Sequence, residues 1–177
     1  VKDMATLVRG FAAVYAKCPR LRLLIAGDGP EKDKLTALAA ELGVERQVCF
    51  AGWISGGMDR FYSALDINAL TSLSETFPYA LTEGARFHLA TVSTAVGGIP
   101  YLIDQDVNGY LFQPGDWQAL GNDLAALGND DELRRRLGEK LYEKGVPREL
   151  WEEALEELPP AEEQVDRFLE RGYDVIC

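Results

Sequence analysis

Two glutamates, Glu75 and Glu83, lie eight residues apart around a short apolar stretch that contains one proline. In a single helix, eight residues turn through about 800° and would put both carboxylates on one face, about 12 Å apart. Pro78 disfavours helix at the residue before it but is well suited to the first turn of a helix. The sequence therefore favours Glu75 on a loop and Glu83 in the first turns of a helix that begins near Pro78.

This arrangement suits a particular ligand chemistry. The amino end of a helix offers free backbone N–H groups and the positive end of the helix dipole, which favour a bound phosphate. Ionised carboxylates only accept hydrogen bonds, so a glutamate on each side of the anion site is suited to holding sugar hydroxyls. The alternative is that both glutamates are solvated surface residues, in a chain with 29 acidic residues.

The rest of the chain alternates between short apolar runs and amphipathic segments. We expect strands at residues 21–26, 48–51, 67–70, 91–93 and 110–112, and helices at residues 4–17, 31–42, 58–64, 78–87 and 117–127. This alternation predicts an α/β fold, with a parallel sheet buried by helices on both faces. Ligands of such sheets bind beyond the carboxyl ends of the strands, so the loops there, including Gly27 and Gly97-Gly98, should line one edge.

Composition narrows the classes of partner. The net charge of −11 and the pI near 4.6 argue against nucleic acid or an anionic membrane as a general partner. No apolar run approaches the ~20 residues that span a bilayer. The chain shows no signal peptide, and Cys18, Cys49 and Cys177 have no metal or redox spacing. We therefore expect a reduced, cytoplasmic protein.

Two further groups of residues invite a catalytic interpretation but favour a structural one. His88 is the only histidine and has no serine or carboxylate at a recognisable spacing, so we expect it to be a packing or surface residue. Asp104 and Asp106 have the spacing of a metal-binding pair, but they precede Val107-Asn108-Gly109, which is a turn signal. We interpret them as part of a turn and expect no bound metal.

Several motifs, taken in chain order, resemble the C-terminal, nucleotide-sugar-binding domain of retaining group 1 (family 4) glycosyltransferases. They are residues 23–30, 48–54, 66–67, 73–75, 75–83 followed by Ala85, 91–100 and 108–116. The resemblance covers roughly residues 1–138. It implies one half of a GT-B fold, in which two Rossmann-like domains face each other. We assign the Rossmann-like domain to residues 1–128 and an acidic helical extension to residues 129–177, with helices at 130–144, 147–158 and 160–171.

The resemblance also implies roles for individual residues. Glu75 and Lys2 take the catalytic positions, with Glu75 on the transferred sugar and Lys2 on the diphosphate of the sugar donor. Glu83 holds the ribose hydroxyls. The other positions expected to bind the sugar donor are Ile54 near the base, Phe77, the amides of Tyr79, Ala80 and Leu81, and Gly27. Many members have a glycine where Pro78 stands, and proline lacks an N–H, so these three amides must serve the phosphate.

The resemblance implies partners as well. A nucleotide sugar is the expected substrate, without metal or other cofactor, and nucleic acid is not an expected partner. The family's upstream arginine, the first strand of the domain and the N-terminal acceptor-binding domain have no counterpart here, so we expect the chain alone to be inactive. A membrane-associated acceptor is compatible with the resemblance. Two alternatives stay open: a stand-alone nucleotide-sugar-binding or regulatory module, and a sugar-nucleotide epimerase or phosphorylase on a similar scaffold.

Overall fold

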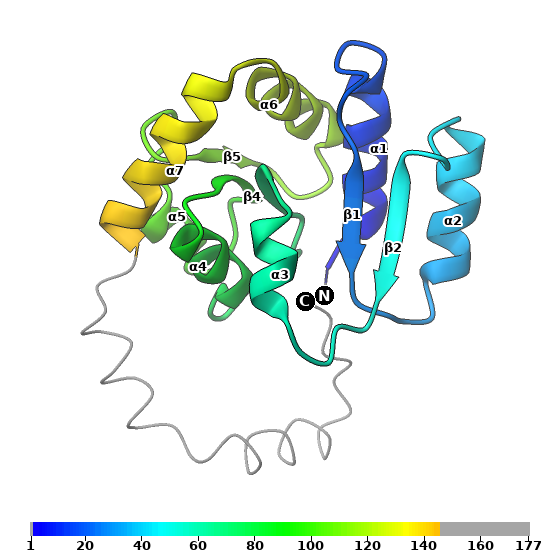
Figure 1. The fold of residues 1–177 in the computed structure, drawn as a ribbon, viewed down its shortest axis with the longest axis horizontal. Helices are drawn as coiled ribbons and strands as arrows, with labels where there is room; N and C mark the ends of the chain where they lie inside the picture. The colour runs from blue at the N-terminus through cyan, green and yellow to red at the C-terminus, as the bar shows by residue number, and fades with distance from the viewer. Residues whose placement is uncertain (1, 146–177) are drawn as a thin grey trace.

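The computed structural model describes residues 2–145, which form a layered α/β structure (Figure 1). Its strands are β1 (Leu23–Ala26), β2 (Val48–Gly52), β3 (Ile67–Leu70), β4 (Ala90–Thr94) and β5 (Tyr110–Phe112). Its helices are α1 (Met4–Tyr15), α2 (Lys32–Glu41), α3 (Met58–Ser63), α4 (Tyr79–Arg86), α5 (Ile99–Leu102), α6 (Trp117–Asn129) and α7 (Asp131–Gly145). Each strand and helix expected within residues 2–145 is present, and the α/β class is confirmed.

The strands form two parallel sheets where the sequence predicted one. One sheet pairs β1 with β2, and the other has the order β3-β4-β5. Within the described residues, β1 and β3 share no ladder. Helices lie on both sides of the strands, as the sequence predicted (Figure 1). All five residues of β4 are buried, as expected for the central strand of a parallel sheet.

Helices α1 and α6 each begin after an aspartate whose side chain caps the first turn. The Asp3 side chain accepts hydrogen bonds from the backbone N–H and the hydroxyl of Thr6, which fixes the start of α1. Asp116 accepts from the N–H of Ala119 and starts α6 in the same way. Helix α1 then packs along α6, where Gly10 and Gly121 let the two backbones approach closely.

Helix α7 follows directly after the expected domain boundary at residue 128. Its Leu137 and Leu141 are fully buried, in two clusters of the core that include residues of β4 and α4. Gly138 leaves no room for a side chain because a Cβ atom there would overlap the carbonyl oxygen of His88. The helices expected at residues 147–158 and 160–171 lie outside the described residues. No helix in the described part of the chain is long and apolar enough to cross a membrane.

Candidate functional site

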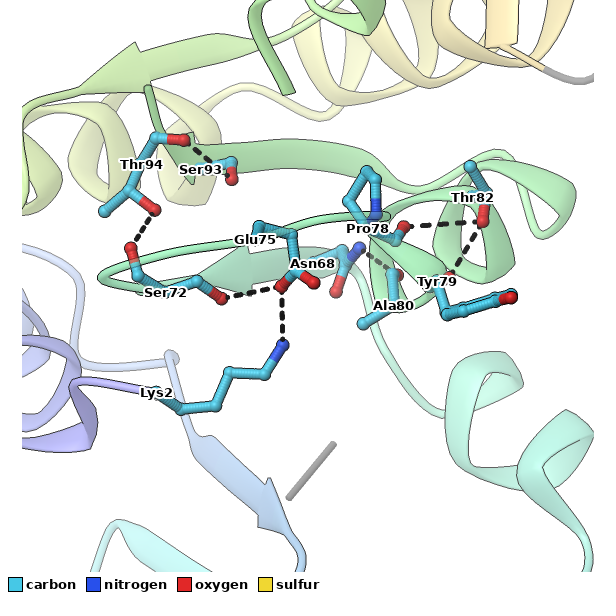
Figure 2. Close-up of polar contacts among 10 residues, drawn as sticks. All are labelled: Lys2, Asn68, Ser72, Glu75, Pro78, Tyr79, Ala80, Thr82, Ser93 and Thr94. Carbon is cyan, nitrogen blue, oxygen red and sulfur yellow. Dashed lines mark hydrogen bonds and ion pairs between the residues drawn. The ribbon is translucent and has the colours of Figure 1, made fainter. Parts of the chain in front are cut away.

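The loop that follows β3 brings Glu75 against the start of the chain (Figure 2). The Lys2 ammonium lies 3.2 Å from Oε2 of Glu75, and both side chains are only 18% exposed. The hydroxyl of Ser72 donates to the same Oε2 atom at 3.1 Å. Seventy-three positions separate Lys2 from Glu75 in sequence. The two predicted catalytic residues therefore lie together at the carboxyl end of β3, with the carboxylate oriented by two donors.

Ser72 is itself held in place by the neighbouring strand. Its backbone carbonyl accepts a hydrogen bond of 2.7 Å from the hydroxyl of Thr94 at the end of β4, and both residues are buried. Figure 2 shows the resulting chain of contacts from Thr94 through Ser72 to Glu75 and Lys2. The sequence places Ser72 in a loop at the ligand edge and Thr94 in a family motif, but it assigned no role to either side chain. Their signal was hydroxyl residues at the exits of two strands that are otherwise buried.

Gly97 packs against the backbone of Glu75. Its φ of +54° lies in the left-handed region, and a Cβ atom at this position would overlap the carbonyl oxygen of Glu75. Only glycine meets both requirements without strain. The sequence predicted that Gly97 and Gly98 line the edge of the sheet where ligands bind. In the structure, Gly97 packs against the loop that carries Glu75.

Glu83 lies in the second turn of α4, which begins at Tyr79 after Pro78 as the sequence suggested. Its carboxylate pairs with Arg86 at 3.6 Å and is 38% exposed. Within residues 2–145, no hydrogen bond or ion pair joins it to Glu75 or Lys2. Helix α4 is fixed to β3 by the buried Asn68, whose amide donates to the carbonyl of Ala80 at 3.0 Å.

The three amides expected to face a phosphate differ in availability. The N–H of Tyr79 donates to Phe77 and the N–H of Leu81 donates to Pro78, each at 3.0 Å. The N–H of Ala80 has no acceptor among the described residues. The rings of Phe77 and Tyr79 lie 4.9 Å apart on the surface beside it. In this conformation, Ala80 is the amide best placed to receive an anion.

The remaining predicted positions lie on the neighbouring sheet. Gly27 follows β1 with a φ of +114° and lines a cavity together with Lys2, Phe50 and Lys32. Lys2 therefore connects the edge at β1 with the edge at β3. Ile54 is half-buried two residues after β2, next to the 60% exposed ring of Trp53, and does not line this cavity.

His88 and the Asp104–Asp106 segment have the structural roles that the sequence favoured. The His88 ring stacks on Tyr142 with centroids 4.1 Å apart and lies 3.2 Å from Glu139, so it packs against α7. The backbone carbonyl of Asp104 accepts from the N–H groups of Val107 and Asn108, which closes a turn before β5. Neither group contributes to the loop around Glu75.

Lys2 and Glu75 thus lie at the carboxyl ends of the strands, which is where parallel α/β folds bind their ligands. Comparison with known proteins defines the family. The model of the family described as "Glycosyl transferases group 1" matches residues 1–144. The chain therefore belongs to the group 1 glycosyltransferases, and the predicted resemblance is confirmed.

Curated relatives agree with this family. N-acetyl-alpha-D-glucosaminyl L-malate synthase of Bacillus anthracis is 32% identical over 143 residues, which are 81% of this chain and 37% of that protein. D-inositol 3-phosphate glycosyltransferase of Corynebacterium glutamicum (strain R) is 31% identical over 149 residues, 80% of this chain and 36% of the relative. The chain thus spans little more than a third of the length of these relatives.

A solved structure shows which part of such proteins this chain corresponds to. The C-terminal domain of the glycosyl transferase group 1 family protein LpcC from Francisella tularensis is 26% identical, with a TM-score of 0.77. The match covers 84% of this chain and 80% of that domain. The fold is therefore that of the C-terminal domain in a group 1 glycosyltransferase.

Proposed function

We propose that this chain supplies the sugar-donor-binding half of a retaining glycosyltransferase, which transfers a sugar from a nucleoside-diphosphate sugar to an acceptor bound elsewhere in the whole protein. The observation that carries the proposal is the pairing of Lys2 with Glu75 at the strand exits of a group 1 domain. A cation there suits a diphosphate, and a carboxylate beside it suits the hydroxyls of the attached sugar.

The chemistry follows from where charge develops. As the glycosidic bond to the donor breaks, negative charge grows on the departing nucleoside diphosphate. Lys2 and the free amide of Ala80 are donors held in advance near that position, which lowers the barrier. In this proposal no side chain attacks the sugar. The acceptor bonds to the sugar on the face from which the diphosphate leaves, through an oxocarbenium-like state, and gives its proton to the departing diphosphate, so the configuration is retained. The reaction needs no metal.

In this mechanism, Lys2 exchanges its ion pair with Glu75 for one with the diphosphate of the donor. Both Lys2 and Ser72 contact Oε2 of Glu75, and neither contact uses Oε1. An arriving diphosphate, with more negative charge than one carboxylate, competes for the Lys2 ammonium. Glu75 then keeps its hydrogen bond from Ser72 and offers its other lone pairs to the sugar hydroxyls.

The remaining site residues take their proposed roles from the family and from their place at the same edge. Glu83 gives up its ion pair with Arg86 and accepts hydrogen bonds from the ribose hydroxyls. The backbone near Ile54 contacts the base of the nucleotide. Gly27, Phe77, Tyr79 and Leu81 complete the surface around the nucleotide. The acceptor binds to the part of the whole protein that this chain does not span, and closure of the two parts excludes water.

Equilibrium binding tests the proposal. Nucleoside diphosphates and their sugars, screened by thermal shift and then by calorimetry, should bind the 177-residue chain with Kd values of roughly 0.1–10 mM. Binding should be unchanged by a chelator. The chain alone should not transfer sugar, whereas the full-length protein should. Absence of binding by every nucleotide and nucleotide sugar would contradict the proposal.

A further inference from the structure

Helix α4 begins without the side-chain cap that starts α1 and α6. Its N-cap residue is Pro78, which supplies no capping side chain, and its first turn contains no acidic residue. The N–H of Ala80 therefore has no acceptor within the described residues. The ends of helices fray when their terminal groups have no partner. The first turn of α4 must therefore be held through other groups.

Side chains hold the carbonyl groups of this turn instead (Figure 2). The hydroxyl of Thr82 donates to the carbonyl of Tyr79 at 2.9 Å. The amide of Asn68 on β3 donates to the carbonyl of Ala80 at 3.0 Å. Because a carbonyl has two lone pairs, the bond from Asn68 is added to the ordinary helix bond of that carbonyl. Thr82 lies within α4 itself, whereas Asn68 ties the turn to the sheet.

Gly84 shows how closely the helix and the strand meet at Asn68. A Cβ atom at Gly84 would lie 2.3 Å from Nδ2 of Asn68 and 2.9 Å from its Cγ atom, which is too close for any side chain. The backbone of α4 therefore packs directly on the Asn68 amide. Apolar packing is non-directional, whereas a hydrogen bond needs its donor and acceptor aligned. Asn68 thus fixes α4 in one position along β3.

We propose that Asn68 is a positioning residue for the sugar donor, an inference that rests on the proposed function. By holding the carbonyl of Ala80, Asn68 keeps the free N–H of the same residue in place for the diphosphate. By its contact with Gly84, it keeps the adjacent Glu83 in place for the ribose. The ligand then binds to groups that are already ordered, which reduces the entropy lost on binding. Asn68 itself is 5% exposed and touches no ligand.

The loop that carries Glu75 is held by a different set of contacts. Ser72 and Lys2 bind its carboxylate, and Gly97 packs against its backbone. Within the described residues, no hydrogen bond joins Asn68 to this loop. Asn68 therefore acts on binding of the nucleotide and leaves the affinity added by the sugar unchanged.

A size swap separates positioning from stability. Asn68→Ala removes the amide and leaves a gap against Gly84, so the Tm should fall by roughly 5 °C or more. Asn68→Ala combined with Gly84→Ala fills the gap with a methyl group. The two Cβ atoms would then lie 3.3 Å apart, which a small shift relieves. At least half of the lost Tm should return in the double variant, but the hydrogen bond to Ala80 stays absent.

Nucleotide affinity should not return with the Tm. UDP, GDP and ADP are the probes, each alone and carrying glucose, and calorimetry is run well below the lowest Tm so that every variant is folded. For the probe that binds wild type most tightly, both Asn68 variants should bind the sugar-free nucleotide roughly fivefold more weakly. The further gain in affinity from glucose should match that of wild type. If Asn68→Ala does not fold, the double variant alone gives the comparison.

Asn108→Ala is the matched control. Asn108 is also buried, and its amide donates to the carbonyl of Leu102 at the end of α5, again at 3.0 Å. This variant should lower the Tm at least as much as Asn68→Ala does. Its affinity for the sugar-free nucleotide should stay within twofold of wild type, because Asn108 does not contact α4 through this bond.

Three results would overturn the inference alone, with nucleotide binding by wild type intact. Recovery of affinity together with the Tm in the double variant would make Asn68 a purely structural residue. An equal loss of affinity in Asn108→Ala would have the same meaning. A loss confined to the gain from glucose would place the effect at Glu75. If wild type binds none of the probes, the proposed function fails and this inference fails with it.

Discussion

At the scale of single residues, Glu75 is the best-supported side chain of the proposed site. Its Oε2 atom receives the Ser72 hydroxyl and the Lys2 ammonium, while its backbone rests on Gly97. Side chains held by this many contacts lose little further entropy when a ligand binds. Because the proposal assigns Glu75 to the sugar, we expect changes around Glu75 to alter binding of the sugar more than binding of the nucleotide.

Ser72→Ala should remove the hydrogen bond that orients Glu75. The expected loss of stability is about 1 kcal/mol, the usual net value for one hydrogen bond. Affinity for a nucleotide sugar should fall, while affinity for the sugar-free nucleotide should stay within twofold. Ser93→Ala is the matched control, because Ser93 is buried on the adjacent strand and its hydroxyl bonds to Thr94. Equal effects of the two variants on sugar binding would remove Ser72 from the site.

The residues of this site were only partly predictable from sequence. The spacing of Glu75 and Glu83 singled out both glutamates, and the family resemblance added Lys2. The contact between Lys2 and Glu75 depends on how the start of the chain returns to β3, which no local pattern encodes. Ser72 and Thr94 were assigned no role because a hydroxyl at the end of a buried strand has no period or spacing that distinguishes it from ordinary capping.

At the scale of elements, the site depends on one close approach between two loops. The loop after β4 packs against the loop after β3 at Gly97, where no side chain fits. The two loops are therefore in direct contact at Gly97, two residues before α5 begins. This contact predicts that a methyl group added at Gly97 weakens ligand binding by displacing the loop that carries Glu75.

Gly97→Ala should lower the free energy of unfolding by about 3 kcal/mol or more, because it combines backbone strain of roughly 1–2 kcal/mol with a steric overlap. It should also weaken nucleotide-sugar binding. Gly115→Ala is the matched control: its φ is +81°, but nothing lies within 4 Å of the added Cβ atom. Urea unfolding of both variants makes the comparison. A loss at Gly97 no larger than the loss at Gly115 would contradict the packing described.

Local patterns predicted the position of every strand and of all the helices in the described residues except α5. The strands at residues 67–70 and 110–112 were expected with the boundaries observed, since each is an apolar run with turn signals on both sides. Helix α5 was not expected, because its four residues are too few to show a helical period. The division into two sheets was also missed, because adjacency of strands is a long-range property.

At the scale of the whole molecule, the described residues pack in three hydrophobic clusters, and helix α7 contributes to two of them. Helix α7 is strongly charged in sequence, yet Leu133, Leu137 and Leu141 turn toward the core. Acidic residues are frequent, and some of them lie in partly buried positions. Asp123 on α6 is the clearest case: burial first, then the charges of Asp106 and Asp116, raise the pKa of its carboxyl to about 6.

Asp123 predicts a pH dependence of stability. A raised pKa means that the folded state holds this proton more tightly than the unfolded chain. Its contribution is therefore complete below about pH 4 and is lost as the pH rises through about 6. Asp123→Asn should stabilise the protein by about 1 kcal/mol at pH 7.5, allowing for solvent screening at a partly buried site, and should be neutral at pH 4.

Thermal unfolding of Asp123→Asn at several pH values makes this measurement, with the exposed Asp66→Asn as control. A stabilisation that is the same at pH 4 and pH 7.5 would show that the charge of Asp123 is not its cause. A loss of stability at pH 7.5 would mean that the carboxylate is favourable where it lies.

The central claim is that one edge of this domain binds the nucleotide through Lys2 and Glu83 and the sugar through Glu75. Calorimetry with a nucleoside diphosphate, and with the same nucleotide carrying its sugar, tests this claim most directly on three variants. Lys2→Ala and Glu83→Ala should weaken both ligands, Glu83→Ala by about 1–3 kcal/mol. Glu75→Gln should bind the sugar-free nucleotide as well as wild type or better, because Lys2 is released from its carboxylate partner.

The decisive comparison is between the two glutamates. The account predicts that Glu75→Gln loses the added affinity that the sugar provides, and that Glu83→Ala keeps this increment while losing affinity for the nucleotide itself. If Glu75→Gln weakens the sugar-free nucleotide as severely as Glu83→Ala does, the proposed division of the site between sugar and nucleotide is wrong.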